Sequence, residues 1–206
     1  MRKTSDIKAV LTDIGGVVLR VHEERTMQAL ADLAGLAPEE IPPLLVTAPQ
    51  VVDRVYTGQW SMRDAYEHSR EPLRSAVSYA QFTEAWMAML GEDFPGVREA
   101  YEALPESVSL YTLSNTSDLH LERMRRHWLY ELSVGFYASC EIGMQKPDAE
   151  IFHFALGRMG VPPTAVLFFD DNEENVLAAG RLGIRAVLVN HPQTVARTLR
   201  ERGIIP

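Results

Sequence analysis

The stretch LFFDDNEENVLAAGRLGIRAVLV, residues 167–189, contains the pattern that decides the fold. It begins with an apolar run that ends at Asp170 and Asp171, continues as an amphipathic segment, and closes with a second apolar run at 185–189. An apolar run, a segment of helical periodicity and another apolar run are typical of a strand, a crossover helix and a parallel strand. The sequence therefore predicts a βαβ unit with two acidic residues at the end of its first strand.

The same alternation extends over most of the chain. Amphipathic helical patterns follow four of the five short apolar runs, which lie at 8–11, 108–113, 134–139, 165–169 and 185–189. Glycines at 160, 180 and 183 stand where helices are expected to stop. Strands that alternate with helices indicate crossover connections in a mainly parallel sheet, which places the chain in the α/β class.

Residues 20–92 depart from this alternation. They are expected to form helices only, separated by prolines and glycines. We interpret them as a helical cap inserted after the first strand, with residues 1–19 and 93–206 forming the catalytic core. Four large side chains of this segment stand at near-helical spacing and are interpreted as helix packing rather than ligand contacts: Met27, Trp86, Met87 and Met89.

Composition narrows the class of protein. A chain of 206 residues fits one domain with an insertion. The net charge of −8 argues against binding to nucleic acid or to an anionic membrane surface, although a local cation still permits a phosphorylated ligand. The single cysteine, Cys140, excludes an internal disulfide, and there is no apolar run of about 18 residues. We expect a soluble cytoplasmic protein, either a monomer or a homodimer.

In open α/β sheets the ligand site lies beyond the carboxyl ends of the strands. Polar residues follow four of the expected strands at this edge: Asp13, Ser114 with Asn115, Lys146, and Asp170 with Asp171. Taken singly, each has an ordinary explanation, such as a helix cap, a turn or a solvated helix start. Because all of them follow strand ends, the set predicts a catalytic site.

Phosphoryl transfer through an aspartyl intermediate is the chemistry that needs this set. Asp13 is the candidate nucleophile, since a carboxylate can attack phosphorus and divide one difficult step into two. Asp13 and Asp171 offer oxygen ligands for Mg²⁺, which offsets the repulsion between an anionic nucleophile and a phosphate. Ser114 and the backbone N–H groups after it, including that of Asn115, are expected to hold phosphoryl oxygens, and Lys146 adds a positive charge.

The four segments TDIGGVV, LYTLSNTSD, GMQKPDAEIF and LFFDDNEENVLAAGRLGIRAVLV resemble, in this order, the four motifs of the haloacid dehalogenase superfamily. The residues of these motifs most resemble those of the α-D-glucose-1-phosphate phosphatase subgroup, with the phosphatase half of soluble epoxide hydrolases as a near relative. The resemblance implies a Rossmann-like three-layer core with an inserted helical cap. It also implies catalytic roles for Asp13, Ser114 and Lys146. For Mg²⁺ it implies the ligands Asp13, the Gly15 carbonyl and Asp171, with support from Asp170.

Gly15 departs from the pattern of the superfamily. Most of its phosphatases carry a second aspartate at this position, which protonates the leaving oxygen and then activates water. The backbone carbonyl is retained here, so a metal ligand remains while an acid/base side chain is lost. A positioned acid or base contributes about 10²–10⁴-fold, so its loss would slow such a site without abolishing catalysis. His22 is one candidate to replace it, although an exposed helix-start histidine is the simpler interpretation.

The function that we expect is therefore a Mg²⁺-dependent phosphatase of a small phosphorylated metabolite, with a sugar phosphate as the candidate substrate. Two alternatives remain open. A non-catalytic binding protein of the same fold is favoured only by Gly15. A metal-independent 2-haloacid dehalogenase also uses an aspartate, a hydroxyl and a lysine, but it leaves the acidic pair without a purpose, since adjacent carboxylates repel each other without a cation.

Two further classes are disfavoured. A mutase needs the missing acid in both half-reactions, and a receiver-type signalling domain carries its acidic pair at the first strand. The sequence assigns no cap residue to the substrate. Tyr56, Trp60 and Arg63 flank the turn YTGQWS. One interpretation is that they face the site, and the other, which we favour, is that they pack within the cap.

Overall fold

The computed structural model describes residues 6–41, 49–74 and 76–206. Its centre is a five-stranded sheet in which every neighbouring pair of strands is parallel. In sheet order the strands are β5 (Gly135–Ala138), β4 (Ser109–Ser114), β1 (Ala9–Thr12), β6 (Val166–Asp170) and β7 (Arg185–Leu188). The prediction of an α/β fold with a mainly parallel sheet is therefore confirmed, and the first strand of the chain lies in the middle of the sheet.

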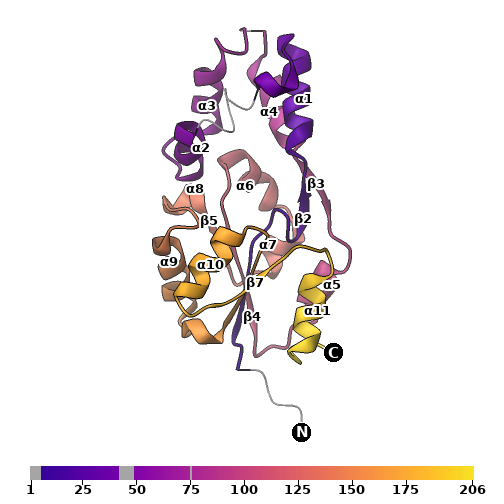
Figure 1. The fold of residues 1–206 in the computed structure, drawn as a ribbon, viewed down its shortest axis with the longest axis vertical. Helices are drawn as coiled ribbons and strands as arrows, with labels where there is room; N and C mark the ends of the chain where they lie inside the picture. The colour runs from indigo at the N-terminus through magenta and orange to yellow at the C-terminus, as the bar shows by residue number, and fades with distance from the viewer. Residues whose placement is uncertain (1–5, 42–48, 75) are drawn as a thin grey trace.

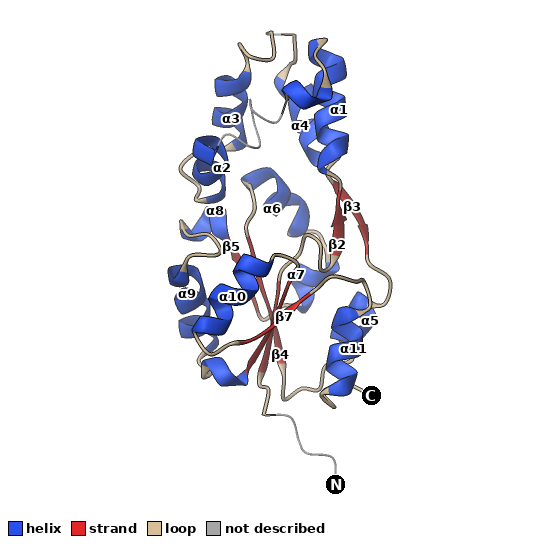
Figure 2. Cartoon of the chain, viewed as in Figure 1, coloured by secondary structure: helices blue, strands red, loops and turns tan. Residues whose placement is uncertain are grey.

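Both faces of the sheet are buried. Successive side chains of a strand point to opposite faces, so Val10 belongs to one apolar cluster while Ala9 and Leu11 belong to the other. Helices cover each cluster and complete three layers (Figure 2). One face is covered by α5 (Val97–Glu102), α6 (Asp118–Met124), α7 (Trp128–Leu132) and α11 (Thr194–Glu201), and the other by α9 (Ala149–Met159) and α10 (Glu173–Arg181).

Two short helical elements complete the core. The short helix α8 (Ser139–Ile142) follows β5 directly, and the 3₁₀ helix η3 (Pro163–Ala165) precedes β6. Helix α9 ends at Gly160, whose φ of 66° closes the helix in the left-handed region where glycine carries no Cβ penalty. The expected helix stop at this glycine is confirmed.

A separate group of helices lies above the carboxyl end of the sheet (Figure 1). It comprises α1 (Glu23–Ala34), the 3₁₀ helix η1 (Pro38–Glu40), α2 (Pro49–Tyr56), α3 (Met62–Ser69) and α4 (Tyr79–Met87). These helices enclose an apolar cluster of their own, to which Met27, Trp86 and Met89 belong. Packing is therefore the role of these three side chains, as expected. Residues 42–48, part of the expected helix PEEIPPLLV, lie outside the described residues.

The expectation that residues 20–92 form helices only is wrong at both ends of the segment. Strand β2 (Leu19–Val21) leaves the core and pairs antiparallel with β3 (Leu90–Asp93), which returns to it. A single extended segment leaving the core would have unpaired backbone N–H and C=O groups. Two adjacent extended segments can instead form hydrogen bonds with each other. The division into a core of 1–19 and 93–206 and a cap of 20–92 stays a prediction, and the separate apolar cluster supports it.

Candidate active site

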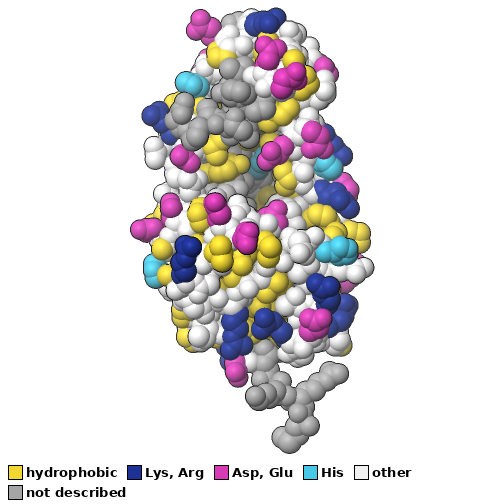
Figure 3. Space-filling model, viewed as in Figure 1, with side chains coloured by type: hydrophobic (Ala, Val, Ile, Leu, Met, Phe, Trp, Pro, Cys, Tyr) yellow, Lys and Arg dark blue, Asp and Glu magenta, His cyan; other side chains and the backbone are white. Residues whose placement is uncertain are grey.

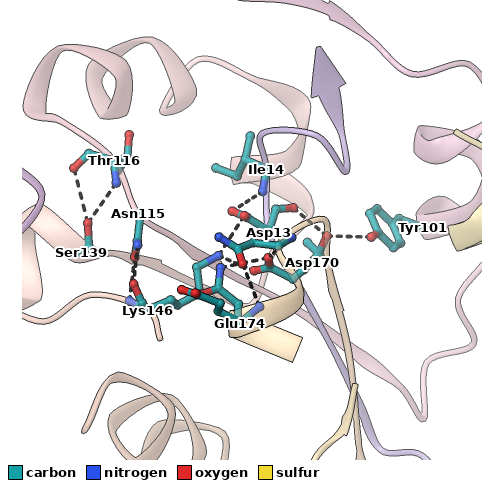
Figure 4. A network of polar contacts seen from close by, with 12 residues as sticks. Asp13, Ile14, Tyr101, Asn115, Thr116, Ser139, Lys146, Asp170 and Glu174 are labelled. Carbon is teal, nitrogen blue, oxygen red and sulfur yellow. Dashed lines mark hydrogen bonds and ion pairs between the residues drawn. The ribbon is translucent and has the colours of Figure 1, made fainter. Parts of the chain in front are cut away.

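The carboxyl edge of the sheet brings the predicted residues together (Figure 4). Asp13 directly follows β1, and its N–H donates to the carbonyl of Phe169 in β6 at 2.9 Å. Ser114 and Asp170 are the last residues of β4 and β6. Because these strands are parallel neighbours, their final side chains share one edge, as the sequence predicted.

Lys146 joins the acidic residues of this edge. Its Nζ donates to Asp13 Oδ2 at 2.9 Å and to Asp170 Oδ2 at 2.7 Å, and the residue is only 3% exposed. Burial alone would lower the pKa of Lys146, but the charges of Asp13 and Asp170 outweigh it and raise the pKa above its ordinary value. Lys146 is thus a permanent cation in contact with the candidate nucleophile.

The carboxyl of Asp13 is mostly but not fully buried, with 14% of the side chain exposed. Its Oδ1 accepts a hydrogen bond from the N–H of Ile14 at 2.7 Å. Burial raises the pKa of Asp13 to about 7, the charge of Lys146 opposes this, and the charge of Asp170 adds to it. The cluster as a whole therefore carries an excess of negative charge that one lysine does not neutralise.

Asp170 and Asp171 differ in their surroundings although they are adjacent. Asp170 is fully buried, and its two oxygens already accept from Lys146 Nζ, from the N–H of Asn172 at 2.9 Å and from Asn175 Nδ2 at 2.9 Å. Asp171 is exposed, and desolvation together with the charge of Asp170 raises its pKa. Asp170 is therefore a positioning group, while Asp171 has oxygens free to face a ligand.

The acidic residues fit a hard divalent cation. Asp13, Asp170 and Asp171 each offer a carboxylate oxygen, and these oxygens lie within 4.8 Å of one another. Gly16 leaves room for them: a Cβ at this residue would lie 1.9 Å from Asp171 Oδ2. An all-oxygen donor set of this charge matches the preference of Mg²⁺.

Asn115 and Ser114 occupy different positions in the phosphoryl side of the site. The side chain of Asn115 donates from Nδ2 to the carbonyl of Lys146 and accepts at Oδ1 from its N–H, both at 2.8 Å. This side-chain amide therefore holds the backbone of Lys146 in place. Ser114 lies at the end of β4 beside Ala138 and is 5% exposed. Their roles in phosphate binding stay predictions.

The surroundings of Gly15 show what a side chain at this residue would meet. A Cβ at Gly15 would lie 2.9 Å from Cγ2 of Val21 in β2. Val21 is 40% exposed, so its side chain has room to rotate. The obstacle to a side chain at this position is therefore one methyl group, and no strained backbone angle is involved.

Sequence reasoning missed a buried hydrogen-bond chain behind the nucleophile. Tyr101 Oη donates to Thr12 Oγ1 at 2.8 Å, and Thr12 Oγ1 donates to the carbonyl of Asp13 at 2.7 Å (Figure 4). Tyr101 lies in α5, which follows the return strand β3. No spacing along the chain relates residues 12 and 101, because only the packing of α5 on β1 brings them together.

Helices α2 and α4, which belong to the predicted cap, contact the rest of the chain beside this edge. Trp86 Nε1 of α4 donates to Ser117 Oγ at 3.2 Å, and Asp53 Oδ1 of α2 accepts from Gln145 Nε2 at 2.9 Å. Gln145 immediately precedes Lys146. Figure 3 shows the viewed face hollowed between cap and core, with acidic side chains around the hollow.

The candidates named in and near the cap fall into two groups. Trp60 contacts the guanidinium of Arg54 at 4.7 Å, and Arg63 covers the ring of Tyr79 at 3.8 Å, so both pack within the cap as expected. The ring of His22 pairs with Glu24 at 2.9 Å and lies against Gly91 of β3. These contacts place His22 at the junction of β2 and α1, beside β3.

Comparison with known proteins agrees with the geometry of the site. The family of haloacid dehalogenase-like hydrolases matches residues 7–183. The chain belongs to this family. The haloacid dehalogenase resemblance read from the four motifs is confirmed, and so is the Rossmann-like fold.

Solved structures and curated proteins of the family include near neighbours of this chain. A haloacid dehalogenase family enzyme of Bacteroides thetaiotaomicron, solved with magnesium and inorganic phosphate, has a TM-score of 0.78 and 25% identity, covering 88% of this chain and 93% of that one. The D-ribitol-5-phosphate phosphatase of the same organism is 23% identical over 184 residues, 86% of this chain and 89% of the relative. A phosphorylated carbohydrates phosphatase of Thermotoga maritima is 32% identical over 114 residues, 54% of this chain and 53% of that protein.

Other relatives are longer than this chain. The chain spans 18% of the drimenol cyclase of Aspergillus calidoustus and 50% of the sesquiterpene phosphatase of Aspergillus oryzae. A structure of an L-2-haloacid dehalogenase, with a TM-score of 0.66 and 22% identity, shares the fold. The family match confirms the prediction of a hydrolase. One family member was solved with magnesium, and the acidic cluster of this chain offers three carboxylates that could hold a metal ion. None of the helices in the described ranges has the length and hydropathy of a membrane-spanning helix.

Proposed function

We propose that the protein is a phosphomonoesterase that hydrolyses a small phosphorylated metabolite through an aspartyl-phosphate on Asp13. The contact that carries the proposal is the Asp13–Lys146–Asp170 triplet, with Nζ–oxygen distances of 2.9 and 2.7 Å, beside the exposed carboxylate of Asp171. A buried carboxylate next to a fixed cation and a metal-binding acid is the arrangement that in-line attack on a phosphate requires.

In the first step an oxygen of Asp13 forms a bond to phosphorus while the bond from phosphorus to the alcohol oxygen breaks. In the second step water displaces Asp13 and releases inorganic phosphate. Lys146 favours the ionised form of Asp13 and would neutralise charge on the phosphoryl oxygens, and Ser114 with the backbone N–H of Asn115 would orient these oxygens. The residues that would hold Mg²⁺ are Asp13, Asp171 and the Gly15 carbonyl, positioned by Asp170. The chemistry that Mg²⁺ supplies when bound is charge neutralisation on the phosphoryl group.

A phosphorylated sugar or polyol is the substrate class that we propose. Two relatives are phosphatases named for D-ribitol 5-phosphate and for phosphorylated carbohydrates. The net charge of the chain also disfavours nucleic-acid substrates. We further propose that residues 20–92 act as a cap over the site, in a protein that is a monomer or a homodimer.

The dehalogenase alternative is disfavoured by the charges at the site. Three carboxylates whose oxygens lie within 4.8 Å share one lysine, and they repel one another unless a cation binds. A metal-free reaction gives such a cluster no role. The non-catalytic alternative rests only on Gly15, whereas Asp13, Lys146 and Asp171 keep the geometry of a reactive site.

The test is phosphate release from a panel of sugar and polyol phosphates, with Mg²⁺ or with EDTA. Wild type is expected to release phosphate only with Mg²⁺, and Asp13→Asn to release none. Asp148→Asn is the matched control, since it removes an exposed carboxylate near Lys146 whose side chain makes no capping hydrogen bond. Acid-quenched protein is expected to carry one phosphoryl group on Asp13 by mass spectrometry. Activity that survives in Asp13→Asn contradicts the mechanism, and no release from any substrate favours the non-catalytic protein.

A further inference from the structure

A threonine occupies a core-facing position of the central strand β1, directly before the candidate nucleophile. Thr12 stands two residues after Val10, so its side chain points to the same face of the sheet, which α5 helps to cover. Thr12 is fully buried, and a buried hydroxyl destabilises a fold unless it is hydrogen-bonded. The partners of this hydroxyl therefore show which groups it holds in place.

The hydroxyl of Thr12 takes part in two hydrogen bonds. Its Oγ1 donates to the carbonyl of Asp13 at 2.7 Å and accepts from Tyr101 Oη at 2.8 Å (Figure 4). A threonine has one O–H proton and a carbonyl can only accept, so the proton between the two hydroxyls comes from Tyr101. Tyr101, which is 1% exposed, thus directs the O–H bond of Thr12 toward Asp13. Hydrogen bonds in such a chain also strengthen one another.

The peptide unit between Asp13 and Ile14 is held at both of its polar groups. Its carbonyl oxygen accepts from Thr12, and its N–H, which belongs to Ile14, donates to Asp13 Oδ1 at 2.7 Å. A peptide unit is planar, so a fixed direction of the C=O bond also fixes the direction of the N–H bond. With Oδ1 held by this N–H, the other oxygen, Oδ2, contacts Lys146 Nζ at 2.9 Å. The chain of hydrogen bonds therefore extends from Tyr101 to the carboxylate itself.

We propose that Tyr101 and Thr12 are positioning residues, which orient the Asp13 carboxylate for attack on phosphorus by holding the Asp13–Ile14 peptide unit. The inference rests on the proposed phosphatase function. Both side chains are buried, so they act through the nucleophile and not on the substrate. Attack is sensitive to the place of the attacking oxygen, and a displacement of about 1 Å can lower the rate about 100-fold.

A purely structural role of the chain predicts a different result. If the chain only satisfies buried hydroxyls, its removal lowers the free energy of unfolding and leaves the chemical step unchanged. Thr26 provides the matched case, because it is also fully buried and its Oγ1 donates to the carbonyl of Ala85 at 2.7 Å, between helices α1 and α4. Thr12→Val and Thr26→Val therefore remove the same kind of hydrogen bond at two places in the molecule.

The experiment measures single-turnover phosphorylation of Asp13 by acid quench, with the best sugar or polyol phosphate and saturating Mg²⁺, alongside thermal melts. Thr12→Val is expected to lower the maximal rate about 10- to 100-fold, as for a misplaced nucleophile. The half-saturating concentration is expected to stay within about 2-fold of wild type, because the groups that would bind phosphate are unchanged. Thr12→Ser keeps the hydroxyl and is expected to recover most of the lost rate. Thr26→Val is expected to lose a similar amount of Tm and to keep the rate of wild type.

Tyr101→Phe is the second variant, and it tests the inference even if Thr12→Val does not fold. It removes one oxygen and keeps the packed ring, so the maximal rate is expected to fall about 3- to 10-fold, as for one lost hydrogen bond. Tyr66→Phe is its matched control, a buried tyrosine whose Oη donates to the carbonyl of Val77 at 3.0 Å. This control is expected to phosphorylate Asp13 at the rate of wild type.

Each outcome decides the inference. Equal rates in Tyr101→Phe and Tyr66→Phe overturn it, and so does a Thr12→Val variant that loses stability but not rate. A Thr12→Ser variant as slow as Thr12→Val also overturns it, since the hydroxyl would then not be the group that matters. If wild type releases phosphate, Asp13→Asn does not and these variants keep the rate of wild type, the proposed function stands without the inference. If wild type releases no phosphate from any substrate, the proposed function fails and the inference fails with it.

Discussion

At the scale of single residues, the site depends on two adjacent glycines that serve different purposes. Gly16 has a φ of 68°, and its lack of a Cβ leaves space for the Asp171 carboxylate. Gly15 provides a backbone carbonyl as a candidate metal ligand, and a Cβ there would contact Val21. Glycine at residue 16 follows from the close approach of Asp171 and from its left-handed backbone angle. At residue 15 neither reason applies, because an added Cβ would meet one methyl group of the exposed Val21 side chain.

Gly16→Ala is expected to weaken Mg²⁺ binding about 10- to 100-fold, the range measured when groups that orient metal ligands are removed. The added Cβ would lie 1.9 Å from Asp171 Oδ2 and must displace this carboxylate. Isothermal titration with Mg²⁺ measures the effect. Gly203→Ala is the control, because Gly203 has a similar φ of 65° and no atom within 4 Å of the added Cβ. Equal Mg²⁺ affinity in the two variants contradicts the prediction.

Gly15→Asp is expected to keep Mg²⁺ binding and to raise kcat for alkyl phosphates, since the backbone carbonyl remains and an acid is added. The gain should be larger when Val21→Ala is combined with it, because the methyl group at 2.9 Å is then removed. Steady-state kinetics of both variants and of Val21→Ala alone measure the effect. Loss of Mg²⁺ binding in Gly15→Asp/Val21→Ala would show that the Gly15 carbonyl is not a ligand.

At the scale of elements, the position of the cap depends on a few contacts between helices of different parts of the chain. The turn after α2 meets α8 at Gly58 and Cys140, and α4 meets the start of α6 through Trp86 and Ser117. Both contact points on the core lie close to strand ends that carry site residues. Any movement of these helices would therefore change the surroundings of the nucleophile.

Gly58→Ala is expected to raise KM and lower kcat, because a Cβ 2.0 Å from the Cys140 carbonyl forces the turn after Tyr56 away from the core. The matched variant is Gly143→Ala, with a φ of 74° and no atom nearer than 4.0 Å. Both substitutions carry a left-handed backbone cost of roughly 1–2 kcal/mol. Thermal melts should therefore show a loss in both, while only Gly58→Ala changes the kinetics. Similar kinetics in the two variants would refute a docked cap.

At the scale of the whole molecule, negative charge is concentrated at the carboxyl edge of the sheet, where burial makes repulsion between carboxylates most unfavourable. The net charge is −8, and three carboxylates gather around one lysine at the carboxyl edge of the sheet. The fold tolerates this cluster because Asp170 is saturated by hydrogen bonds and because five parallel strands with two covering layers fix the edge rigidly. Stability without metal is therefore lower than the size of the core alone would give.

The metal-free protein is expected to gain stability from Asp13→Asn, and the gain is expected to grow with pH. The pKa of Asp13 is about 7 in the folded protein and 3.8 as its ordinary value, so the folded state binds more protons between these limits. The stability of wild type relative to the variant therefore falls as pH rises from about 4 to 7 and is constant above, by about 1.4 kcal/mol per pKa unit at most.

Thermal melts in EDTA at pH 5 and pH 8 measure this difference. Added Mg²⁺ should raise the Tm of wild type more than that of Asp13→Asn, because binding stabilises only the state that holds the ligand. A difference in Tm that is the same at both pH values contradicts the pH dependence.

The sequence by itself determined the alternation of strands and helices in the parallel sheet, the edge of the sheet at which the polar residues meet, and the candidates Asp13, Lys146, Asp170 and Asp171. It could do so because strand periodicity and position at a strand end are local properties of the chain. The tertiary structure decided which of these groups is buried and saturated, as in Asp170, and which stays open, as in Asp171. It also decided the pairing of β2 with β3 and the Tyr101–Thr12 hydrogen-bond chain. These depend on contacts between residues far apart in the chain, for which no spacing in the sequence provides a signal.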